Sequence, residues 1–486
     1  MKKILVSVLL AVCLVCAGLA VACAPKYCVL NFERIQGIEY VSEVVDGAEV
    51  KKGYTVDFKL VIDENKVNIS GDAPEVRANG AVLTCDADGV YKYKVNSNTL
   101  ITVSNATAKY TIEFDTTVNV MDDSNNVGES IENGVYYYSD DVDVNKVTVL
   151  ENGTQVKFTL RPSVYCAPVN PQEGIIVLAD TTIIWPDDNG VYTVEVTGNV
   201  KIQVRGLQQD TAFTLRDDGG EGTAANPFKI SKPIDLYYLA AYVNTDSFSS
   251  SIDFRGAYYE MTNDLDLKGE QLYIIGDLVA TQSAFFYGDF NGNGYTISNY
   301  HIKDYVIDQE VYMNVFTPYI GVFGFAGAAV GARAANIYNL NVENFEISAD
   351  VTSATIIGGR DDKNDKSFAV GGIVGYSVGA TLTGCSASGK IEVTAAADSP
   401  AFAGGLVGYQ TAAADTSVRY YSAVRSCSSA VNITGYSGRI YAAGGITGYL
   451  ASLNRGTSSF ILNSYNRGEV RGAMNVGGIV GILGAN

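Results

Sequence analysis

The chain has 486 residues, and its 53 acidic and 34 basic side chains give a formal net charge of −19 and a sequence pI of about 4.5. This acidic balance argues against nucleic-acid binding, which needs a basic footprint, and the length exceeds that of one ordinary domain. The single histidine, His301, argues against histidine-based zinc sites and against Ser-His-Asp or Cys-His catalysis.

Residues 1–22 have the pattern of an export signal. Lys2 and Lys3 precede an apolar run from Ile4 to Val21, and small residues lead up to Cys23. The cysteine directly after this run makes the segment similar to a bacterial lipoprotein signal, which implies that Cys23 is lipidated. Lipid chains there would tether the protein to a membrane without spanning it. Plain secretion with an incidental cysteine is the alternative.

Two phrases in the first half of the chain recur after 100 and 101 residues: 53–60 as 153–160, and 89–95 as 190–196. Short alternating strands between turn residues predict two β-sandwich modules, at 26–105 and 109–207. The D-x-D-G-V-Y phrase before the final strands resembles that of the Ig-like stalk modules of bacterial surface proteins. A polar insertion at 125–143 in the second module is predicted to be a loop.

After a turn-rich hinge at 217–223, Ser231 can cap a helix whose first turn takes Pro233 and Asp235. Four apolar residues then fall on one helix face: Leu236, Leu239, Ala240 and Val243. We expect this helix to cover the exposed backbone at the first rung of a β-helix.

The last third of the chain is organised around a repeated glycine phrase. It reads Gly-Gly-Ile-Val-Gly-Tyr at 371–376 and recurs at 404–409, 444–449 and 477–481, with a degenerate copy at 321–325. The second glycines are 51, 33, 40 and 33 residues apart, a period that predicts supersecondary units stacked in one dimension. The glycines expected to build the repeat core are Gly321, Gly324, Gly372, Gly375, Gly405, Gly408, Gly445, Gly448, Gly478 and Gly481. The tyrosines that follow, Tyr376, Tyr409 and Tyr449, should form a ladder on one face, where they could contact a ligand.

A second phrase follows the glycine phrase, at 385–391, 427–433 and 465–470. Its alternation of apolar and small polar residues predicts strands. Because a unit of two or three short strands cannot bury its own apolar face, the units should stack as a parallel β-helix. Cys385 and Cys427 hold matching positions, so we expect both in the core as reduced, small apolar residues.

Together the two phrases resemble the GLUG repeats of bacterial surface proteins, whose motif is GG[LI]VG followed by N-C-x-x-x-G-x-[VI]. Four copies keep the glycine half and three keep the second half. Gly384 and Ser426 stand where the motif has asparagine, and Tyr465 stands where it has cysteine. The resemblance covers roughly residues 214–486 and implies a β-helix fold, surface placement and adhesion to a glycan or to a host or neighbour-cell surface protein.

Two acidic stretches are candidates for chemistry. Asp264 and Asp266 would point the same way on a strand, as paired carboxylates of glycoside hydrolases do, although a solvated sheet corner is the favoured alternative. Residues 289–294 have a faint likeness to a calcium loop but lack its glutamate, so a hairpin turn at Asn293 and Gly294 is expected. We therefore predict no catalytic residue, no metal and no cofactor. The 32 tyrosines could serve sugar or protein contact, or could be ordinary strand residues.

The sequence thus predicts an all-β protein, with two Ig-like β-sandwich modules followed by a right-handed parallel β-helix at 214–486 and one short capping helix. We expect an exported, lipid-anchored cell-surface protein that binds a glycan or a surface protein and is not an enzyme. A polysaccharide-degrading β-helix enzyme and a structural spacer are the alternatives. Residues 478–483 are neither charged nor interrupted by proline, so the open edge of the final rung predicts weak end-to-end self-association.

Overall fold

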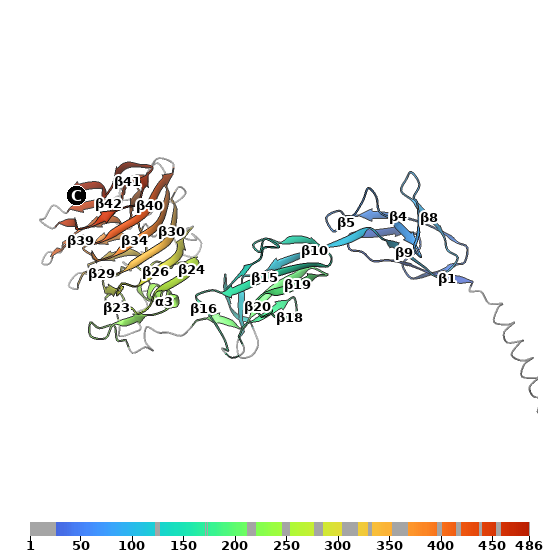
Figure 1. Ribbon diagram of the computed structural model, residues 1–486, viewed down its shortest axis with the longest axis horizontal. Coiled ribbons are helices and arrows are strands. Elements are labelled where there is room, and N and C mark those ends of the chain that lie inside the picture. Colours follow the sequence, from blue (N-terminus) through green and yellow to red (C-terminus); the bar gives the residue numbers. More distant parts are fainter. Residues whose placement is uncertain are drawn as a thin grey trace, which may run out of the picture. The chain divides into compact units, whose positions relative to one another are not determined.

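The computed structural model describes residues 26–121, 127–170, 172, 174–210, 220–244, 253–276, 285–303, 319–328, 333–351, 368–395, 401–414, 419–436, 440–452 and 458–485. The chain divides into two compact units. Unit 1 comprises residues 1–161 and 168–208, and unit 2 comprises residues 162–167 and 209–486 (Figure 1). Strands dominate the described segments, which contain a single helix, so the predicted all-β class with one short helix is confirmed.

Unit 1 contains two sandwiches with the same strand order. The first module contains two sheets. The strand order of the larger sheet is β3 (Ala48–Lys51), β1 (Tyr27–Phe32), β9 (Thr99–Val103), β6 (Val76–Ala78), β7 (Ala81–Val82), and that of the smaller sheet is β2 (Ile38–Ser42), β4 (Thr55–Ile62), β8 (Tyr91–Lys94). In the second module, the larger sheet has the order β14 (Thr148–Glu151), β10 (Ala106–Phe114), β20 (Val200–Arg205), β17 (Ile176–Ala179), β18 (Thr182–Ile184). The smaller sheet has the order β13 (Val135–Tyr138), β15 (Thr154–Pro162), β19 (Tyr192–Val196). β5 (Val67–Ile69) of the first module pairs with the start of β10, so one strand serves both modules.

The same aromatic arrangement fills each sandwich. Phe58 and Tyr91 stack with ring centroids 5.3 Å apart in the first module, and Phe158 and Tyr192 stack at 5.3 Å in the second. The alternation along β4 and β15 turns these rings inward, where they are buried. Each module therefore has its own apolar core, which the recurring phrases encode.

The described part of the segment 125–143 contains two strands, at 127–131 and 135–138, so the prediction of a loop was wrong there. β12 (Val127–Ile131) pairs with β11 (Val118–Met121), and β13 is an edge strand of the smaller sheet of the second module. Tyr137 is buried against Phe114 and Phe158, as Tyr40 of β2 packs against Phe32 and Phe58. Asp, Asn and Ser residues precede and follow β13 in the sequence. Its short alternation of buried and exposed residues therefore did not indicate a strand. A second short pairing, β16 (Cys166–Pro168) with β21 (Leu207–Gln209), follows later.

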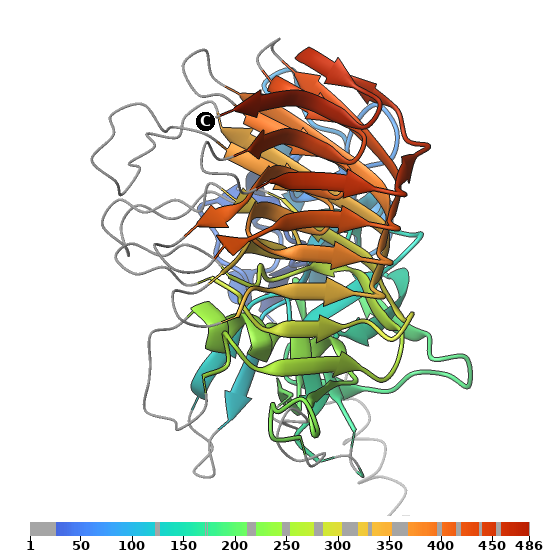
Figure 2. The same cartoon turned by 90° about the vertical axis from the view of Figure 1, so that its left-hand side faces the viewer.

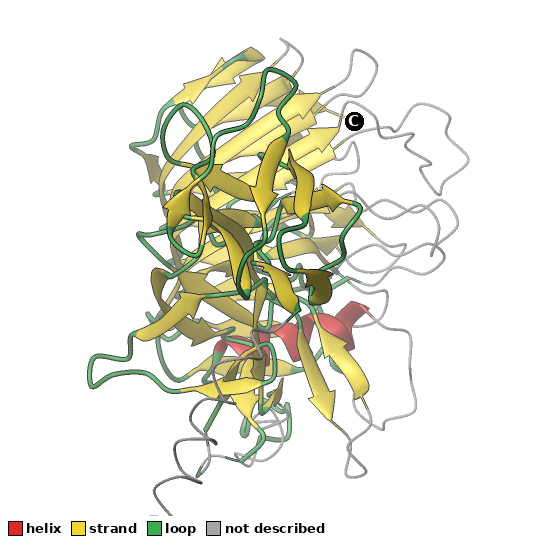
Figure 3. Cartoon of the chain, turned by 90° about the vertical axis from the view of Figure 1, so that its right-hand side faces the viewer, coloured by secondary structure: helices red, strands yellow, loops and turns green. Residues whose placement is uncertain are grey.

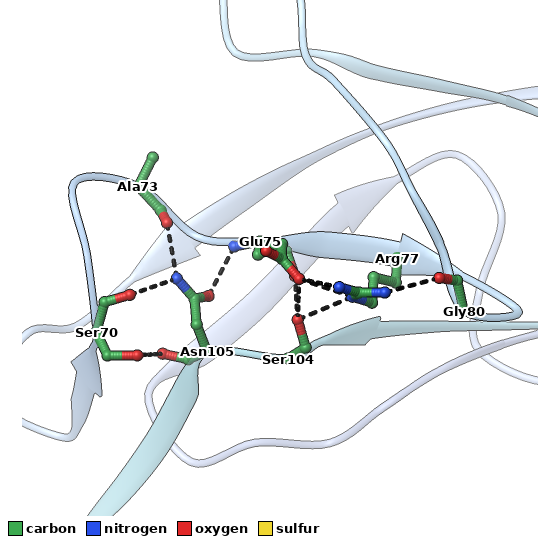
Figure 4. A network of polar contacts seen from close by, with 7 residues as sticks. All are labelled: Ser70, Ala73, Glu75, Arg77, Gly80, Ser104 and Asn105. Carbon is green, nitrogen blue, oxygen red and sulfur yellow. Dashed lines mark hydrogen bonds and ion pairs between the residues drawn. The ribbon is translucent and has the colours of Figure 1, made fainter.

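Figure 4 shows a polar network that holds the connection before β6 in the first module. The Asn105 amide donates to the carbonyls of Ser70 (2.7 Å) and Ala73 (2.9 Å) and accepts from the Glu75 N–H (2.7 Å). Arg77 contacts the Glu75 carboxylate and donates to the Gly80 carbonyl at 2.9 Å. Because every partner belongs to the same module, the network fixes its turns rather than presenting a binding site.

Unit 2 winds through four parallel sheets (Figure 2). Sheet 1 is β22 (Phe228–Ile230), β23 (Tyr258–Met261), β25 (Asp289–Asn291), β29 (Asn336–Tyr338), β33 (Thr381–Thr383), β39 (Ser422–Arg425), β43 (Ser459–Leu462). Sheet 2 is β24 (Leu265–Gln271), β26 (Thr296–Ile302), β30 (Asn341–Val351), β34 (Ser386–Ala395), β40 (Ser428–Tyr436), with β44 (Tyr465–Asn466) and β45 (Val470–Arg471) on β40.

Sheet 3 is β27 (Tyr319–Ile320), β31 (Phe368–Gly371), β35 (Ala401–Gly404), β41 (Ile440–Gly444), β46 (Ala473–Gly477). Sheet 4 is β28 (Phe323–Gly327), β32 (Val374–Val378), β36 (Val407–Thr411), β42 (Thr447–Ser452), β47 (Val480–Ala485). A short hairpin of β37 (Ala413–Ala414) and β38 (Arg419–Tyr420) interrupts one turn. Successive strands of the chain enter different sheets and pair in parallel with the next turn, which is the predicted β-helix. One continuous apolar cluster fills its interior.

The helix α3 (Pro233–Asn244) lies at the end of the stack where sheet 1 begins (Figures 2 and 3). The Asp235 carboxylate accepts the backbone N–H groups of Ser231 (2.8 Å) and Lys232 (2.9 Å), which closes the first turn. The predicted apolar face is buried: Leu236, Leu239, Ala240 and Val243. No helix in the described segments has the length and apolar character that a membrane span requires.

Residues 162–167, from the second sandwich module, belong to unit 2. The Ser163 hydroxyl donates to Glu270 at 2.6 Å, and the Val164 N–H donates to the same carboxylate at 2.9 Å. The Tyr165 hydroxyl donates to the Gln271 carbonyl at 2.7 Å. Glu270 is only 2% exposed, so these donors replace its solvation. No sequence pattern indicates this contact.

Asn293 and Gly294 form a corner rather than the expected hairpin. β25 ends at Asn291 and β26 begins at Thr296, and these strands belong to different sheets. Both turn residues have positive φ angles, 52° and 81°. The Asn-Gly pair correctly indicates a reversal in the left-handed region, but the chain turns into the next sheet instead of pairing with the strand it left.

Candidate functional site: glycine corners and tyrosine surfaces

Each glycine phrase forms the tight corner between sheet 3 and sheet 4. A Cβ atom on the first glycine would overlap the carbonyl oxygen three residues later, far inside van der Waals contact: 2.1 Å at Gly371, 1.8 Å at Gly404, 2.0 Å at Gly444 and 1.7 Å at Gly477. On the second glycine it would meet the carbonyl of the equivalent glycine one rung on: 2.5 Å at Gly372, 2.2 Å at Gly405 and 2.2 Å at Gly445. Gly478, in the final rung, has nothing within 4 Å. The interior corners therefore admit only glycine.

The third glycine brings sheets 3 and 4 together backbone to backbone. Its Cβ would meet main-chain atoms of a neighbouring strand: 2.6 Å at Gly375, 2.5 Å at Gly408, 2.7 Å at Gly448 and 2.7 Å at Gly481. In the degenerate copy, Gly324 would meet the Ile274 side chain at 2.8 Å and the Gly276 carbonyl at 2.9 Å. These glycines are therefore needed for packing rather than for ligand contact.

The degenerate copy is aligned one position differently from the sequence prediction. Ile320 pairs with Val370, so Gly321 takes the place of the first glycine, Gly371. Phe323 pairs with Val374, which leaves this corner one residue shorter than the later ones. Sequence spacing alone cannot detect such a deletion inside a phrase.

The residue after the third glycine forms an aromatic column in sheet 4. Backbone pairing aligns Phe325, Tyr376, Tyr409 and Tyr449 in successive strands. Successive ring centroids are 5.2, 5.1 and 4.8 Å apart. Phe402 of sheet 3 packs on this column, 5.3 Å from Tyr409 and 5.1 Å from Tyr449. The three tyrosines therefore lie in one ladder and are partly exposed.

Neighbouring rings cover much of the ring faces in this column. Tyr409 and Tyr449 stack with an interplanar angle of 11°, and Phe325 and Tyr376 with 25°, whereas Tyr376 meets Tyr409 edge to face at 82°. A sugar needs an open ring face to stack on. The column consequently offers a ligand mainly ring edges and hydroxyl groups.

Cys385 and Cys427 lie at the corner between sheets 1 and 2, only 2% and 1% exposed, and both are free thiols. The Cys385 N–H donates to the Cys427 sulfur at 3.3 Å, and the Cys427 N–H donates to the Ser464 hydroxyl at 3.1 Å. At this corner the side chain of the residue in one rung thus accepts a hydrogen bond from the backbone N–H of the equivalent residue in the rung before it. Hydrogen bonding to Cys427, together with burial, raises the pKa of Cys385, which favours its neutral thiol.

Ser464, not Tyr465, matches the cysteine position in the final repeat, because Ser428 pairs with Tyr465. The residue before the cysteine has a positive φ angle in each rung, 63° at Gly384, 52° at Ser426 and 52° at Asn463. Asparagine and glycine tolerate this left-handed conformation, which explains why the motif has asparagine there and why glycine replaces it.

A second aromatic group, which we call the α3 tyrosine surface, was missed at the sequence level. It consists of Tyr165, Tyr237, Tyr238, Tyr242 and Tyr273. Tyr237 and Tyr273 meet nearly perpendicular, with centroids 4.8 Å apart and an 84° angle, and Tyr165 lies 5.6 Å from Tyr273. Tyr273 is 45% exposed and Tyr242 37%. Tyr237 and Tyr273 thus meet edge to face, whereas Tyr242 stacks on Phe254 with ring centroids 4.5 Å apart and an interplanar angle of 20°.

Part of this surface could have been found from the sequence. Tyr237, Tyr238 and Tyr242 lie on α3 away from its buried face, and the i, i+4 spacing of the last two indicates a shared side. Tyr273 lies two residues after the end of β24 and contacts Tyr237 directly. Tyr165 is brought in by the contact of residues 162–167 with Glu270 and Gln271. Burial raises the pKa of Tyr273, helped by Tyr237 and Glu270, so its hydroxyl stays protonated at neutral pH.

The acidic candidates are engaged in local contacts. Asp264 accepts the Thr296 N–H at 2.8 Å, and Asp266 accepts the Lys268 N–H at 2.8 Å and the Asn299 amide at 2.8 Å. In sheet 1, other carboxylates form ion pairs, Asp289 with Arg333 at 2.9 Å and Glu260 with Lys229. The described segments contain no group of three or more His, Cys, Asp or Glu side chains placed to hold a metal ion. The predicted lipidation residue, Cys23, lies outside the described residues.

One turn of this β-helix corresponds to a known sequence motif. Residues 366–393 match the GLUG motif family. The matched segment contains the glycine corner at 371–376 and the corner at Gly384 and Cys385, together with the strands β31 to β33 and most of β34. The GLUG motif in this chain is therefore one glycine corner, one left-handed corner and the strands between them.

One solved structure is also similar, a crystal structure described as that of "a putative immunoglobulin A1 protease" from Bacteroides ovatus. It is 16% identical, and the match covers 55% of this chain and 79% of that chain with a TM-score of 0.25. A likeness at this level carries no argument about function. The comparison with curated proteins gave no match.

Proposed function

We propose that this protein is an exported cell-surface binding protein, and that its GLUG β-helix presents tyrosines to a glycan or to a surface protein of a host or neighbouring cell. The observation that carries the proposal is the α3 tyrosine surface. A structural spacer has no need of grouped, partly exposed aromatic rings, which cost solvation and favour association. A contact surface does need them, because tyrosine gives large amphipathic contact with few rotatable bonds.

A glycan is the ligand to test first. Sugar rings have apolar C–H faces that pack on open aromatic faces and hydroxyl groups that bond to phenols. Tyr237 and Tyr273 supply perpendicular rings within one contact area, with centroids 4.8 Å apart. The aromatic column of sheet 4 is the second candidate contact, through the edges and hydroxyls of Tyr376, Tyr409 and Tyr449.

We further propose that the protein is not an enzyme. Glycoside hydrolysis needs two carboxyl groups, one acid and one nucleophile or base, facing a common substrate. Asp264 and Asp266 hold backbone and amide hydrogens of their own turns instead. Asp289 and Glu260 are each paired with a cation. A carboxylate engaged in this way is poorly placed to take a proton from a sugar or a water.

Attachment to the membrane through lipid on Cys23 is part of the same proposal. Replacing Cys23 with Ala should move the protein from the membrane fraction to the soluble fraction, because one residue carries the whole anchor. Replacing Cys85, which is exposed, with Ala is the matched control and should leave the protein with the membranes. Retention of the Cys23→Ala variant in the membrane fraction would contradict lipid anchoring.

The ligand is best found by screening the mature chain, produced without residues 1–22, on glycan and matrix-protein arrays. The double variant Tyr237→Ala, Tyr273→Ala should lose the signals that the unmodified chain gives. Tyr54→Ala is the control, because Tyr54 has the same 45% exposure as Tyr273 but lies in unit 1. Equal binding by the double variant would overturn the assignment to the α3 tyrosine surface, and an array without signal would favour the spacer.

A further inference from the structure

The two buried cysteines of the β-helix hold equivalent positions in successive rungs. Cys385 precedes β34 and Cys427 precedes β40, and these two strands pair in parallel. On one side of the cysteines, the Gly384 N–H donates to the Arg425 carbonyl at 3.0 Å. On the other side, the Ser428 N–H donates to the Cys385 carbonyl at 2.9 Å. Because paired strands lie about 4.8 Å apart, this backbone already meets the Cα separation of about 4.4–6.8 Å that a disulfide needs.

The side chains of these two cysteines, which we call the thiol pair, are in contact. The Cys427 sulfur accepts the Cys385 N–H at 3.3 Å, and the two thiols are hydrogen-bonded to each other. The residue before each cysteine has a positive φ angle, 63° at Gly384 and 52° at Ser426, so both side chains leave the backbone in the same local geometry. The sulfur atoms are thus neighbours inside the stack.

The surroundings of the thiol pair favour a thiolate on Cys427. Hydrogen bonds from the Cys385 thiol and the Cys385 N–H lower the pKa of Cys427, although burial opposes them. The same contact between the thiols raises the pKa of Cys385. Because the thiolate is the nucleophile in thiol–disulfide exchange, Cys427 is suited to attack first and Cys385 to follow.

The other described cysteines have no such partner. Cys28 lies opposite a valine of β3, and Cys85 lies opposite a tyrosine of β8. Cys166 lies in β16, whose partner strand β21 contains no cysteine. Within the described segments, the thiol pair is therefore the one place where cysteines are aligned in neighbouring strands.

We propose that the thiol pair closes a disulfide between successive rungs when the chain folds in the presence of a small-molecule disulfide. The Cys427 thiolate attacks one sulfur of that disulfide, R–S–S–R, which forms a mixed disulfide and releases the first thiol. Cys385 then gives up its proton and attacks the Cys427 sulfur, which expels the second thiol. The two cysteines lose two electrons and two protons in total, and the oxidant leaves as two molecules of RSH.

Burial decides when this bond forms. The two cysteines are only 2% and 1% exposed, so an oxidant reaches them while the rungs are open and not in the closed stack. A chain folded under reductant therefore keeps both thiols. Disulfides form and persist where exported proteins fold, so formation of the bond in the cell rests on the proposed export, whereas the chemistry of the thiol pair does not.

The bond would stabilise the β-helix by restricting its unfolded state. It closes residues 385–427 into a covalent loop, which removes conformations that the unfolded chain otherwise has. For a loop of this length in a unit of this size, the unfolding midpoint of unit 2 should rise by roughly 10 °C.

Oxidative refolding tests the proposal. The mature chain, with Cys23 and Cys85 replaced by Ala, is unfolded and then refolded either with reduced and oxidised glutathione or with reductant alone. Free thiols are alkylated, and the digested protein is analysed by mass spectrometry without reduction. After oxidative refolding we expect a peptide linked through Cys385 and Cys427, and an unfolding midpoint for unit 2 roughly 10 °C above that of the reduced chain.

Cys385→Ser in the same background is the matched control, because it removes one sulfur and keeps a small hydrogen-bonding side chain. Oxidative refolding should not raise its unfolding midpoint. Alkylation of both thiols after oxidative refolding would overturn the proposal, as would linkage of Cys427 to Cys28 or Cys166, an unchanged midpoint, or an equal gain by Cys385→Ser. None of these results involves Cys23 or a ligand, so they are distinguishable from failure of the proposed function.

Discussion

The glycine corners make a sharp prediction about stability, because one motif position occurs both inside the stack and at its open end. In Gly405→Ala the new methyl group would lie 2.2 Å from the Gly445 carbonyl oxygen and 2.2 Å from the Ser429 hydroxyl. The carbonyl belongs to the paired backbone of the next rung and cannot rotate away. Relief requires the two rungs to separate locally, which breaks the interface that the repeat exists to form.

The expected cost is at the upper end of the range for overpacked cores, about 3 kcal/mol in the free energy of unfolding. For a unit of this size that corresponds to a fall in Tm of roughly 6–12 °C. Gly478→Ala is the matched control, since Gly478 holds the same motif position with nothing within 4 Å. It should be neutral or slightly stabilising, by about 0.5 kcal/mol, through the lower entropy of the unfolded chain.

The assay is thermal unfolding followed by far-ultraviolet circular dichroism on the full mature chain, at a concentration where it is monomeric. Gly405→Ala should lower the unfolding midpoint of unit 2 and leave that of unit 1 in place. Equal midpoints for Gly405→Ala and Gly478→Ala would refute the reasoning, because the two positions would then be packed alike.

Three further predictions concern buried thiols and one turn. Thiol labelling of the native protein should modify the exposed Cys85 and spare Cys385 and Cys427 until the chain is denatured; quantitative labelling of all three in the native state would contradict the corner packing. Cys427→Ser should cost less stability than Cys427→Ala, by about 1 kcal/mol, because only serine can still accept the Cys385 N–H; equal unfolding midpoints would argue against that hydrogen bond. The Val191 N–H, followed by that of Asn189, lowers the pKa of Asp187. The stability that this turn gives unit 1 is complete above the unfolded pKa of about 3.9 and is lost as pH falls through the lower folded pKa. The unfolding midpoint of unit 1 should therefore fall more steeply between pH 5 and pH 2 in the unmodified chain than in Asp187→Asn. Parallel curves for the two proteins would count against this contribution of Asp187.

The parts of the fold that local geometry dictates were predictable from the sequence. The Gly-Gly corner is specified by glycine alone, because a Cβ would lie 1.7–2.1 Å from a carbonyl oxygen at its first position. Its recurrence therefore marks the rungs, and the alternation beside it marks the strands. The buried face of α3 was equally readable, because it lies within one short segment. The predicted cap was not correct: the Asp235 carboxylate accepts the N–H of Ser231, and the Ser231 hydroxyl donates to that carboxylate.

The parts of the fold that depend on strand register or on distant contacts were not predictable from the sequence. One residue separates Ser464 from Tyr465, yet the backbone pairing places the first in the corner and leaves the second 49% exposed. β13 lies in a polar stretch, and only its burial against Phe158 identifies it as a sandwich strand. The α3 tyrosine surface joins Tyr165 to Tyr273 through a contact more than 100 residues apart in the chain. No local pattern encodes that meeting.

The central claim, that the β-helix binds a ligand through its open tyrosines, is tested most directly by titrating the strongest array hit into three forms of the mature chain. These are the unmodified chain, the double variant Tyr237→Ala, Tyr273→Ala, and the double variant Tyr376→Ala, Tyr409→Ala. We predict a dissociation constant raised at least about tenfold by the first double variant, which loses more than 1.4 kcal/mol of contact, and a smaller effect of the second, whose ring faces are already covered. Unchanged affinity in both variants, with thermal unfolding showing both folded, would contradict the account.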